Sequence, residues 1–390
     1  MNDFTSIRPE LDRLQRISLR VGVAALALCA VGAGLNPKRF FEAYLMAYVF
    51  WVGIALGCQT ILMIHHLAGG RWGFAVRRLL EAASKTLPLL TILFIPCLLG
   101  LYSLYIWTHP ETLAADEVLR HKQLYLNVPF FLVRAGIYFA VWLGTMILLN
   151  RASMAQDQTP SRETTRRLTL ISGAGLGLYM LTMTFASIDW MMSLEPHWFS
   201  TIYGVLIMTG QVLGAFAWVI IIAALLVTEK PYANVIGPLH FHDLGNFLLT
   251  FVIFWAYMAF SQFLIIWSGN LTDENSWYLQ RLLGGWKWVG VALIILHFFV
   301  PFLLLLSRDL KRRSHSLVKV ALLVFVMGFV DIFWIVAPGF GRPVFRVYWM
   351  DVIAPIGIGG VWVAMFIKHL KSQPAIPVHD SRVEEELEWA

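Results

Sequence analysis

Residues 201–227 read TIYGVLIMTGQVLGAFAWVIIIAALLV, a continuous run without an acidic or basic side chain. The hydrocarbon core of a bilayer is about 30 Å thick, and a helix needs roughly 20 residues to cross it. Nine other apolar stretches of comparable length occur along the chain, separated by short polar connections. The sequence therefore predicts ten transmembrane helices, with spans near 18–35, 44–67, 87–107, 124–149, 168–189, 201–227, 245–268, 285–307, 317–337 and 349–369.

The composition of the 390 residues is typical of an integral membrane protein, since 58% are hydrophobic and only 14% are charged. No soluble domain fits between the apolar stretches. We therefore expect an all-α fold in which short segments, 1–17 and 370–390, flank a membrane domain at 18–369. Within that domain, 44–189 and 201–337 are candidate four-helix bundles, and the first and last spans flank them.

The basic residues sort by side of the membrane and form no single patch, so the net charge of +6 does not indicate a nucleic-acid partner. Twenty Lys and Arg residues fall in the two termini and the even-numbered connections, against seven in the odd-numbered connections. The second connection alone contributes Arg71, Arg77, Arg78 and Lys85. Because positive residues accumulate on the cytoplasmic side of a membrane, both termini are predicted to be cytoplasmic.

Aromatic residues gather where this topology places the outer membrane interface, as in the aromatic belts of membrane proteins. We expect most of them to be interfacial anchors. The residues concerned are Trp107, Trp190, Trp198, Trp267, Trp277, Tyr278, Trp286, Trp288 and Trp349.

Few residues could hold a redox cofactor. Cys29, Cys58 and Cys97 lie in different predicted spans and form no C-x-x-C motif, so neither an iron–sulfur cluster nor a disulfide framework is supported. Of eleven histidines only His297 lies deep in a span, and one histidine cannot supply both axial ligands of a b-type haem. The chain is expected to hold no cofactor, no metal ion and no catalytic residue of its own.

A small set of ionisable residues is expected inside the lipid, where a charge costs several kcal/mol unless it faces water or a partner. They are Arg134, Asp189, His297 and Asp331. In the two candidate bundles, Arg134 and His297 occupy the third helix and the aspartates occupy the fourth, a pattern that suggests a parallel repeat. Each residue is a candidate for a proton path. In the structural alternative, Arg134 pairs with an aspartate and holds helices together.

The outer segment DWMMSLEPHWF (189–199) places Asp189, Glu195 and His197 within nine positions and contains no basic residue. Neighbouring acids and histidines hold protons at staggered pKa values, so a cluster of this kind can relay protons. The structural alternative is that Glu195 and Pro196 end a turn while His197 forms a hydrogen bond at the interface.

The inner segment that contains His240, His242 and Asp243 precedes the predicted span at 245–268. Two histidines and one aspartate on a short loop are a weak metal motif. We expect them to take up protons or to cap the following helix, and Asp243 is well placed for such a cap.

Prolines predict irregular helices in two spans. Pro88 and Pro96 lie in or next to the third span, and Pro301 lies in the eighth. A proline removes a backbone hydrogen bond and frees carbonyl groups that then need other partners. Such kinks either admit water or a quinone head group, or they are packed and dry.

Two long strings, TMTFASIDWMMSLEPHWFSTIYG (182–204) and GPLHFHDLGNFLLTFVIFWAYMAFSQFLIIWSGN (237–270), are unusual enough to indicate a family. They resemble the ActF-type membrane subunit of alternative complex III, the bacterial quinol:cytochrome c or cupredoxin oxidoreductase. That subunit is a member of the wider group of NrfD and polysulfide-reductase membrane subunits. The resemblance extends over essentially the whole chain, including ten spans and cytoplasmic ends.

The resemblance implies a cofactor-free subunit of the bacterial inner membrane, without activity alone, beside a paralogous ActC-type subunit that binds quinol. Periplasmic partner subunits would carry iron–sulfur clusters and several c-type haems, with menaquinone or ubiquinone nearby and a terminal oxidase as a further candidate partner. The paralogue's quinol-site motif does not align with this chain. The residues in positions that match the family's proton route are Asp189, Glu195, His197, His297 and Asp331.

Two other classes of function remain open. A secondary transporter would need a substrate site near the bilayer midplane, between broken helices. A purely structural scaffold would need no charged residue inside the membrane.

Overall fold

The computed structural model describes residues 7–158, 161–229, 232–234 and 236–375, and every regular element in these ranges is helical. Lys230 and Arg382 of the topology count, and residues 1–6 and 376–390 of the predicted terminal segments, lie outside the described residues. Ten helical segments of the described chain are long and apolar enough to cross a membrane. The predicted all-α, ten-span fold is therefore confirmed.

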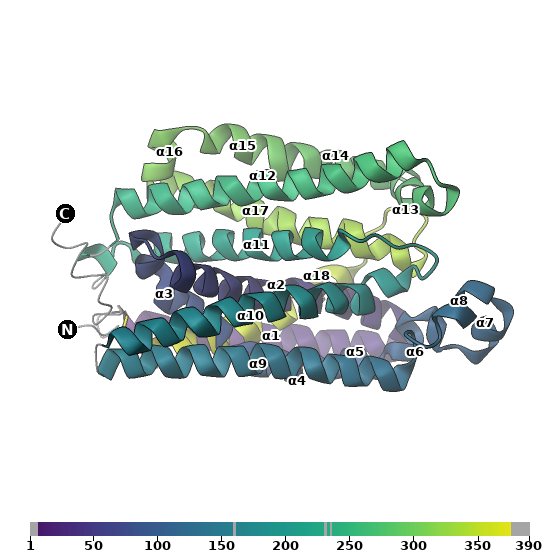
Figure 1. Ribbon diagram of the computed structural model, residues 1–390, viewed down its shortest axis with the longest axis horizontal. Coiled ribbons are helices and arrows are strands. Elements are labelled where there is room, and N and C mark those ends of the chain that lie inside the picture. Colours follow the sequence, from purple (N-terminus) through teal and green to yellow (C-terminus); the bar gives the residue numbers. More distant parts are fainter. Residues whose placement is uncertain (1–6, 159–160, 230–231, 235, 376–390) are drawn as a thin grey trace.

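The ten segments lie side by side, and the described ends of the chain are at the same end of the molecule (Figure 1). We call this end the inner end and the opposite end the outer end. The segments are α1 (Arg8–Leu35), α2 (Pro37–Ala68), α3 to α5 (Arg71–Leu99), α9 (Val128–Gln158), α10 (Arg162–Trp190), α11 (Tyr203–Leu226), α12 (Pro238–Gly269), α14 to α15 (Trp286–Leu305), α17 (Ser314–Val336) and α18 (Trp349–Lys371).

Shorter helices lie in the connections. At the outer end, α7 and α8 project beyond the long helices (Figure 1). The short helices are α6 (Leu101–Leu104), α7 (Pro110–Ala115), α8 (Glu117–Lys122), α13 (Thr272–Leu282) and α16 (Arg308–Arg312).

Helix α2 is the centre of the molecule because it is buried on all sides and packs against α3, α10, α11 and α18. Helix α11 contacts α12 and α17 on its other side. An earlier group of helices, α2 to α10, therefore meets a later group, α11 to α17, along α2 and α11. A Cβ added to Gly57 of α2 would lie only 2.3 Å from the carbonyl oxygen of Gln211. Small residues allow this kind of close approach between membrane helices.

Several spans begin earlier than the hydropathy pattern predicts, and two of them by ten residues or more. Helix α1 begins at Arg8 instead of residue 18, and the third span begins at Arg71 instead of residue 87. Arg77 and Arg78, which the charge count places in a connection, are therefore helical and almost fully buried. A hydropathy average falls with each charged residue whether or not its charge is paired, and this explains the difference.

The third span is interrupted near its prolines, as expected. It is divided into α3 (Arg71–Ser84), α4 (Leu87–Ile92) and α5 (Ile95–Leu99). Pro88 and Pro96 occupy the first turns of α4 and α5, where proline is tolerated because the amide it lacks has no helical partner.

The eighth span is also irregular. A π-helical segment (Leu293–Phe299) separates α14 (Trp286–Ala292) from α15 (Val300–Leu305), which carries Pro301 in its first turn. Segments of π-helix are rare and are frequent at functional sites. His297 lies within this segment.

The aromatic belt is smaller than the sequence predicts. Trp267, Trp288 and Trp349 are exposed at the outer end, as interfacial anchors would be. The other five predicted belt tryptophans are buried because they pack between helices and loops, as in the stacked rings of Trp198 and Trp277, 5.0 Å apart. These five are Trp107, Trp190, Trp198, Trp277 and Trp286.

The ten-span topology requires that the inner and outer ends of the molecule be exposed on opposite sides of the membrane. Glu117 lies in α8 at the outer end, and Arg313 lies between α16 and α17 at the inner end. We expect a membrane-impermeant thiol reagent to label Glu117→Cys and Arg313→Cys from opposite sides of the membrane, with Arg313→Cys accessible only from the cytoplasm. The native Cys29, Cys58 and Cys97 are buried and serve as unreactive controls. Labelling of both introduced thiols from one side would contradict the topology.

Candidate functional site

Asp189, at the outer end of α10, is fully buried and held by Arg134 of α9. Nε and Nη2 of Arg134 donate to the two carboxylate oxygens of Asp189 at 2.8 and 2.9 Å. The Tyr138 hydroxyl donates to the same carboxylate at 2.6 Å, and Arg134 also donates to the Tyr125 carbonyl at 2.9 Å. The geometry is thus that of the structural alternative, in which Arg134 pairs with a buried aspartate.

Glu195 and His197 do not join Asp189 in one cluster, contrary to the sequence prediction. Glu195 accepts a hydrogen bond of 2.8 Å from Arg281, whereas His197 Nε2 lies 2.6 Å from the carboxylate of Asp116. The 3-10 turn Met192–Leu194 and the turn that follows it direct successive side chains to different neighbours. The three titratable groups are therefore close in the sequence but have separate partners in the structure.

Asp116 has its own local role in the projecting outer segment. Its carboxylate caps α8 by accepting hydrogen bonds from the Val118 and Leu119 amides. Desolvation alone would raise the pKa of Asp116, but the Leu119 amide and His197 outweigh it, so the pKa lies below its usual value. The contact of Asp116 with His197 joins this segment to the loop that follows α10.

Asp331 of α17 lies among helices of the later group and forms no ion pair with any described residue. Only 6% of its surface is exposed, and the Trp255 indole donates a hydrogen bond to its Oδ2 at 3.0 Å. The Trp255 ring also meets the ring of His297 edge to face, with centroids 4.4 Å apart. His297 is buried, and neither of its ring nitrogens has a hydrogen-bond partner among the described residues.

The inner segment before the predicted seventh span also differs from expectation. Helix α12 begins at Pro238, and His240 Nδ1 accepts a hydrogen bond from the Gly237 amide at its start. Asp243 therefore lies inside the helix and does not cap it; it pairs with Arg71 of α3 at 3.2 Å. The hydropathy pattern places the start of the helix too late, which explains the error.

His242 is close to polar groups at the inner end of α12. Its Nδ1 lies 3.4 Å from the Asn246 amide nitrogen, and Asn246 accepts a hydrogen bond of 2.7 Å from Lys311. No group of three or more His, Cys, Asp or Glu residues in the described ranges has the geometry of a metal site. His240, His242 and Asp243 are thus not arranged as the ligands of one metal ion.

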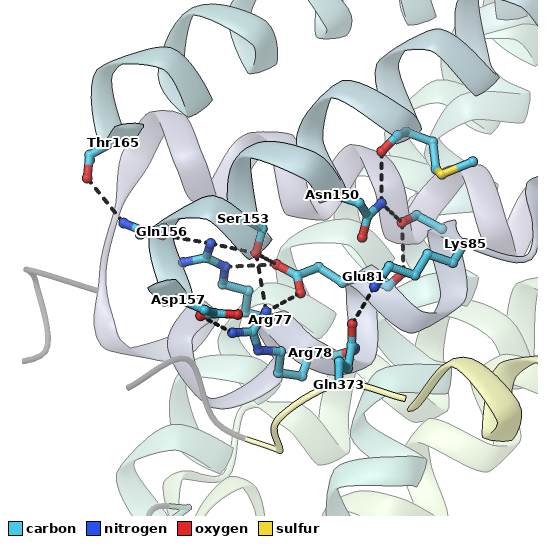
Figure 2. A network of polar contacts seen from close by, with 12 residues as sticks. Arg77, Arg78, Glu81, Lys85, Asn150, Ser153, Gln156, Asp157, Thr165 and Gln373 are labelled. Carbon is cyan, nitrogen blue, oxygen red and sulfur yellow. Dashed lines mark hydrogen bonds and ion pairs between the residues drawn. The ribbon is translucent and has the colours of Figure 1, made fainter. Parts of the chain in front are cut away.

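A buried network at the inner end, which the sequence analysis missed, surrounds Glu81 of α3 (Figure 2). Glu81 accepts hydrogen bonds from Arg77 at 2.9 Å, from Arg78 at 2.7 Å and from the Ser153 hydroxyl at 2.5 Å. Arg78 also pairs with Asp157 of α9. The spacing of three and four residues between these arginines and Glu81 was the available signal, because it places them on one helical face.

The segment that follows α18 contacts this network. The Gln373 side chain donates to the Arg78 carbonyl at 2.8 Å and accepts from Lys85 at 2.7 Å (Figure 2). Gln373 is almost completely buried. The inner network therefore connects α3, α9 and the segment after α18.

A third buried network, at the outer end, was also missed. Arg342 donates to Glu42 at 2.9 Å and to Asp351 at 2.8 Å, and Arg39 donates to Glu42 at 2.6 Å. Glu42 and Asp351 lie in the first turns of α2 and α18 or next to them, so they read as interfacial residues in the sequence. The network ties the outer ends of these two helices together.

No protein-family model matches the chain, and no curated protein matches it. Fold and hydropathy define a multi-pass integral membrane protein with ten candidate spans in the described ranges. Within it, the Trp255, His297 and Asp331 cluster is the candidate functional site, because it combines buried titratable groups with a π-helical segment.

Loss of either partner of the Arg134–Asp189 pair should destabilise the protein. Removing one member leaves the other charge buried and unpaired, which costs roughly 3 to 5 kcal/mol. We expect Arg134→Gln and Asp189→Asn each to lower the free energy of unfolding in detergent by this amount. The double variant should lose less than the sum of the two single changes.

The control for this prediction is Arg71→Gln, because the Arg71 side chain is half exposed in its pair with Asp243. Exposed pairs contribute about 1 kcal/mol or less. Equal losses in Arg71→Gln and Arg134→Gln would show that burial of the Arg134 pair has no special effect.

Proposed function

We propose that the chain is the ActF-type membrane subunit of alternative complex III and that it provides a proton-conducting path through its later helices. The observation that carries the proposal is the buried Asp331, which no cation balances among the described residues and which shares Trp255 with His297. The strings at 182–204 and 237–270 support the family assignment.

The setting of Asp331 favours proton chemistry over structural pairing. A bare charge inside a bilayer is costly, and intramembrane acids and histidines commonly belong to proton relays. A carboxyl group that has no cation beside it can hold a proton and release it when a path opens. His297, whose ring meets the same indole edge to face, offers a second proton site with two uncommitted nitrogens.

Further polar groups lie on either side of this cluster along α12. Trp255 and Gln262 are seven residues apart, so they lie on one face of the helix at about 10 Å separation. Gln262 accepts a hydrogen bond from Ser200 at 3.2 Å, near the outer end. At the inner end, Asn246 contacts His242 and Lys311. Protons would pass between these groups through water, because side chains alone do not bridge them.

The candidate residues at the outer end each have a charged partner. Asp189 and Glu195 are each held by an arginine, which suits them to fixing helices and loops in place. His197 and Asp116 join two outer segments. We assign the proton path to Asp331 and His297 and the supporting role to the paired acids.

The partners follow from the same assignment. A paralogous ActC-type subunit would bind menaquinol or ubiquinol, and periplasmic iron–sulfur and multihaem cytochrome c subunits would accept its electrons. The subunit would lie in the bacterial inner membrane with both termini in the cytoplasm, and a terminal oxidase could take up the electrons downstream. This chain would contribute no cofactor and would have no activity alone.

A transporter fits the structure less well. Inverted or parallel repeats place their broken helices at corresponding positions of the two halves. Here the third span is broken near Pro88 and Pro96, whereas the eighth span is irregular at 293–299. These are the second helix of the earlier group and the third helix of the later group, so they do not correspond.

Replacement of Asp331 separates a relay from a structural role. Asparagine has nearly the shape of aspartate and still accepts the Trp255 hydrogen bond, but it cannot carry a proton in exchange. We expect Asp331→Asn to assemble normally and to lower proton-coupled quinol oxidation roughly tenfold or more. The measurement is turnover and proton release by the purified complex in liposomes.

Asp189→Asn is the matched comparison, because its partner Arg134 would remain charged and buried. It should reduce the yield of assembled complex while the assembled fraction keeps its turnover. Wild-type turnover and proton stoichiometry in Asp331→Asn would rule out the relay at this position, and failure of Asp331→Asn to assemble would assign the residue a structural role.

A further inference from the structure

A groove of about 510 Å³ lies on the side of the molecule where α1 and α17 face each other across α2 and α18. Its floor includes Phe50 and Trp51 of α2, which are almost fully buried. Val21, Val326 and Ile356 line it from α1, α17 and α18, and each is roughly half exposed. The groove therefore opens toward the surroundings of the helices, which in a membrane are lipid chains.

The lining of this groove excludes water as its stable occupant. A buried water needs two to four polar partners, and the side chains that line the groove are apolar apart from Ser18 and the Trp51 indole nitrogen. That nitrogen already donates to the Pro355 carbonyl at 2.9 Å. A hydrocarbon chain is narrow enough and apolar enough.

A positive charge lies on the inner side of the groove. Lys319 of α17 is exposed and forms no ion pair with any described residue. It precedes Val326 by seven residues, so both lie on the same face of α17, with Lys319 about 10 Å nearer the inner end. A lysine at this depth extends its amine toward the head groups of the adjacent leaflet.

We propose that the groove between α1 and α17 is a binding site for one acyl chain of an anionic phospholipid whose phosphate contacts Lys319. The lipid belongs to the leaflet at the inner end. Its head group lies at the level of Lys319, and its chain runs outward along Val326 and Val330 over the floor formed by Phe50 and Trp51. This site is independent of the proton path.

The test uses photo-crosslinking of the full-length chain, purified from its membrane with whatever subunits accompany it. The probe is phosphatidylglycerol with a diazirine in its acyl chain, reconstituted into nanodiscs of phosphatidylcholine. We expect saturable labelling of the peptide that contains 325–330, removed by excess unlabelled phosphatidylglycerol. Val326→Trp, which fills the groove, should reduce this labelling at least tenfold, whereas Leu303→Trp on the exposed face of α15 should leave it unchanged.

Lys319→Gln tests the head-group contact separately. One lysine near a membrane surface favours an anionic lipid roughly fivefold. The variant should therefore lose about fivefold in competition by phosphatidylglycerol relative to phosphatidylcholine, while Lys287→Gln near the outer end should not.

Three results would overturn the proposal. Labelling of 325–330 that does not saturate, or that Val326→Trp leaves unchanged, would mean that the surface only touches bulk lipid. Labelling by a diazirine-bearing isoprenoid quinone that phosphatidylglycerol does not displace would assign the groove to a quinone tail. Absence of labelling, with a crosslink to another subunit instead, would assign it to a protein contact.

Discussion

The cost of placing charge in a low-dielectric interior governs the arrangement of this protein. Almost fully buried arginines pair with acidic residues in networks near the ends of the helices, where α9 meets α10, α3 meets α9, α2 meets α18, and α13 meets the loop after α10. In a membrane the hydrophobic effect does not determine which helices pack together, because lipid chains are as apolar as the helix surfaces. Each network supplies a specific contact between the elements that it joins. Specific geometry among the helices therefore depends on these polar contacts. The networks are Arg134 with Asp189, Arg77 and Arg78 with Glu81, Arg281 with Glu195, and Arg342 with Glu42 and Asp351.

The fourth helix of each group of helices carries a buried aspartate, but the two aspartates have different partners. Asp189 receives two hydrogen bonds from Arg134 and one from Tyr138, so its charge is balanced where it lies. Asp331 receives one hydrogen bond from the neutral Trp255, and His297 of the third helix meets that ring edge to face. One group thus resembles a fixed support, and the other retains groups that can change protonation without breaking an ion pair.

The sequence predicts the ten helices well because a span of apolar residues has few alternatives in a bilayer. His297 and Asp331 could be singled out for the same reason, since a polar residue deep in such a run is conspicuous. Glu42, Glu81 and Asp351 could not be singled out, because a charged residue at the edge of a span cannot be distinguished in the sequence from a residue of the adjoining loop. Their partners are also unpredictable from one sequence: Arg342 is 300 residues from Glu42, and no local pattern connects them.

That separation has a consequence for biogenesis. Glu42 enters the membrane region with α2, but Arg342 is synthesised 300 residues later. At 5 to 20 residues per second, the carboxylate waits roughly 15 to 60 s for this partner. Arg39, one helical turn away and already bonded to Glu42, can balance the charge during that interval. The nascent chain would thus carry a temporary counterion next to Glu42, and the last helices to leave the ribosome would complete the network.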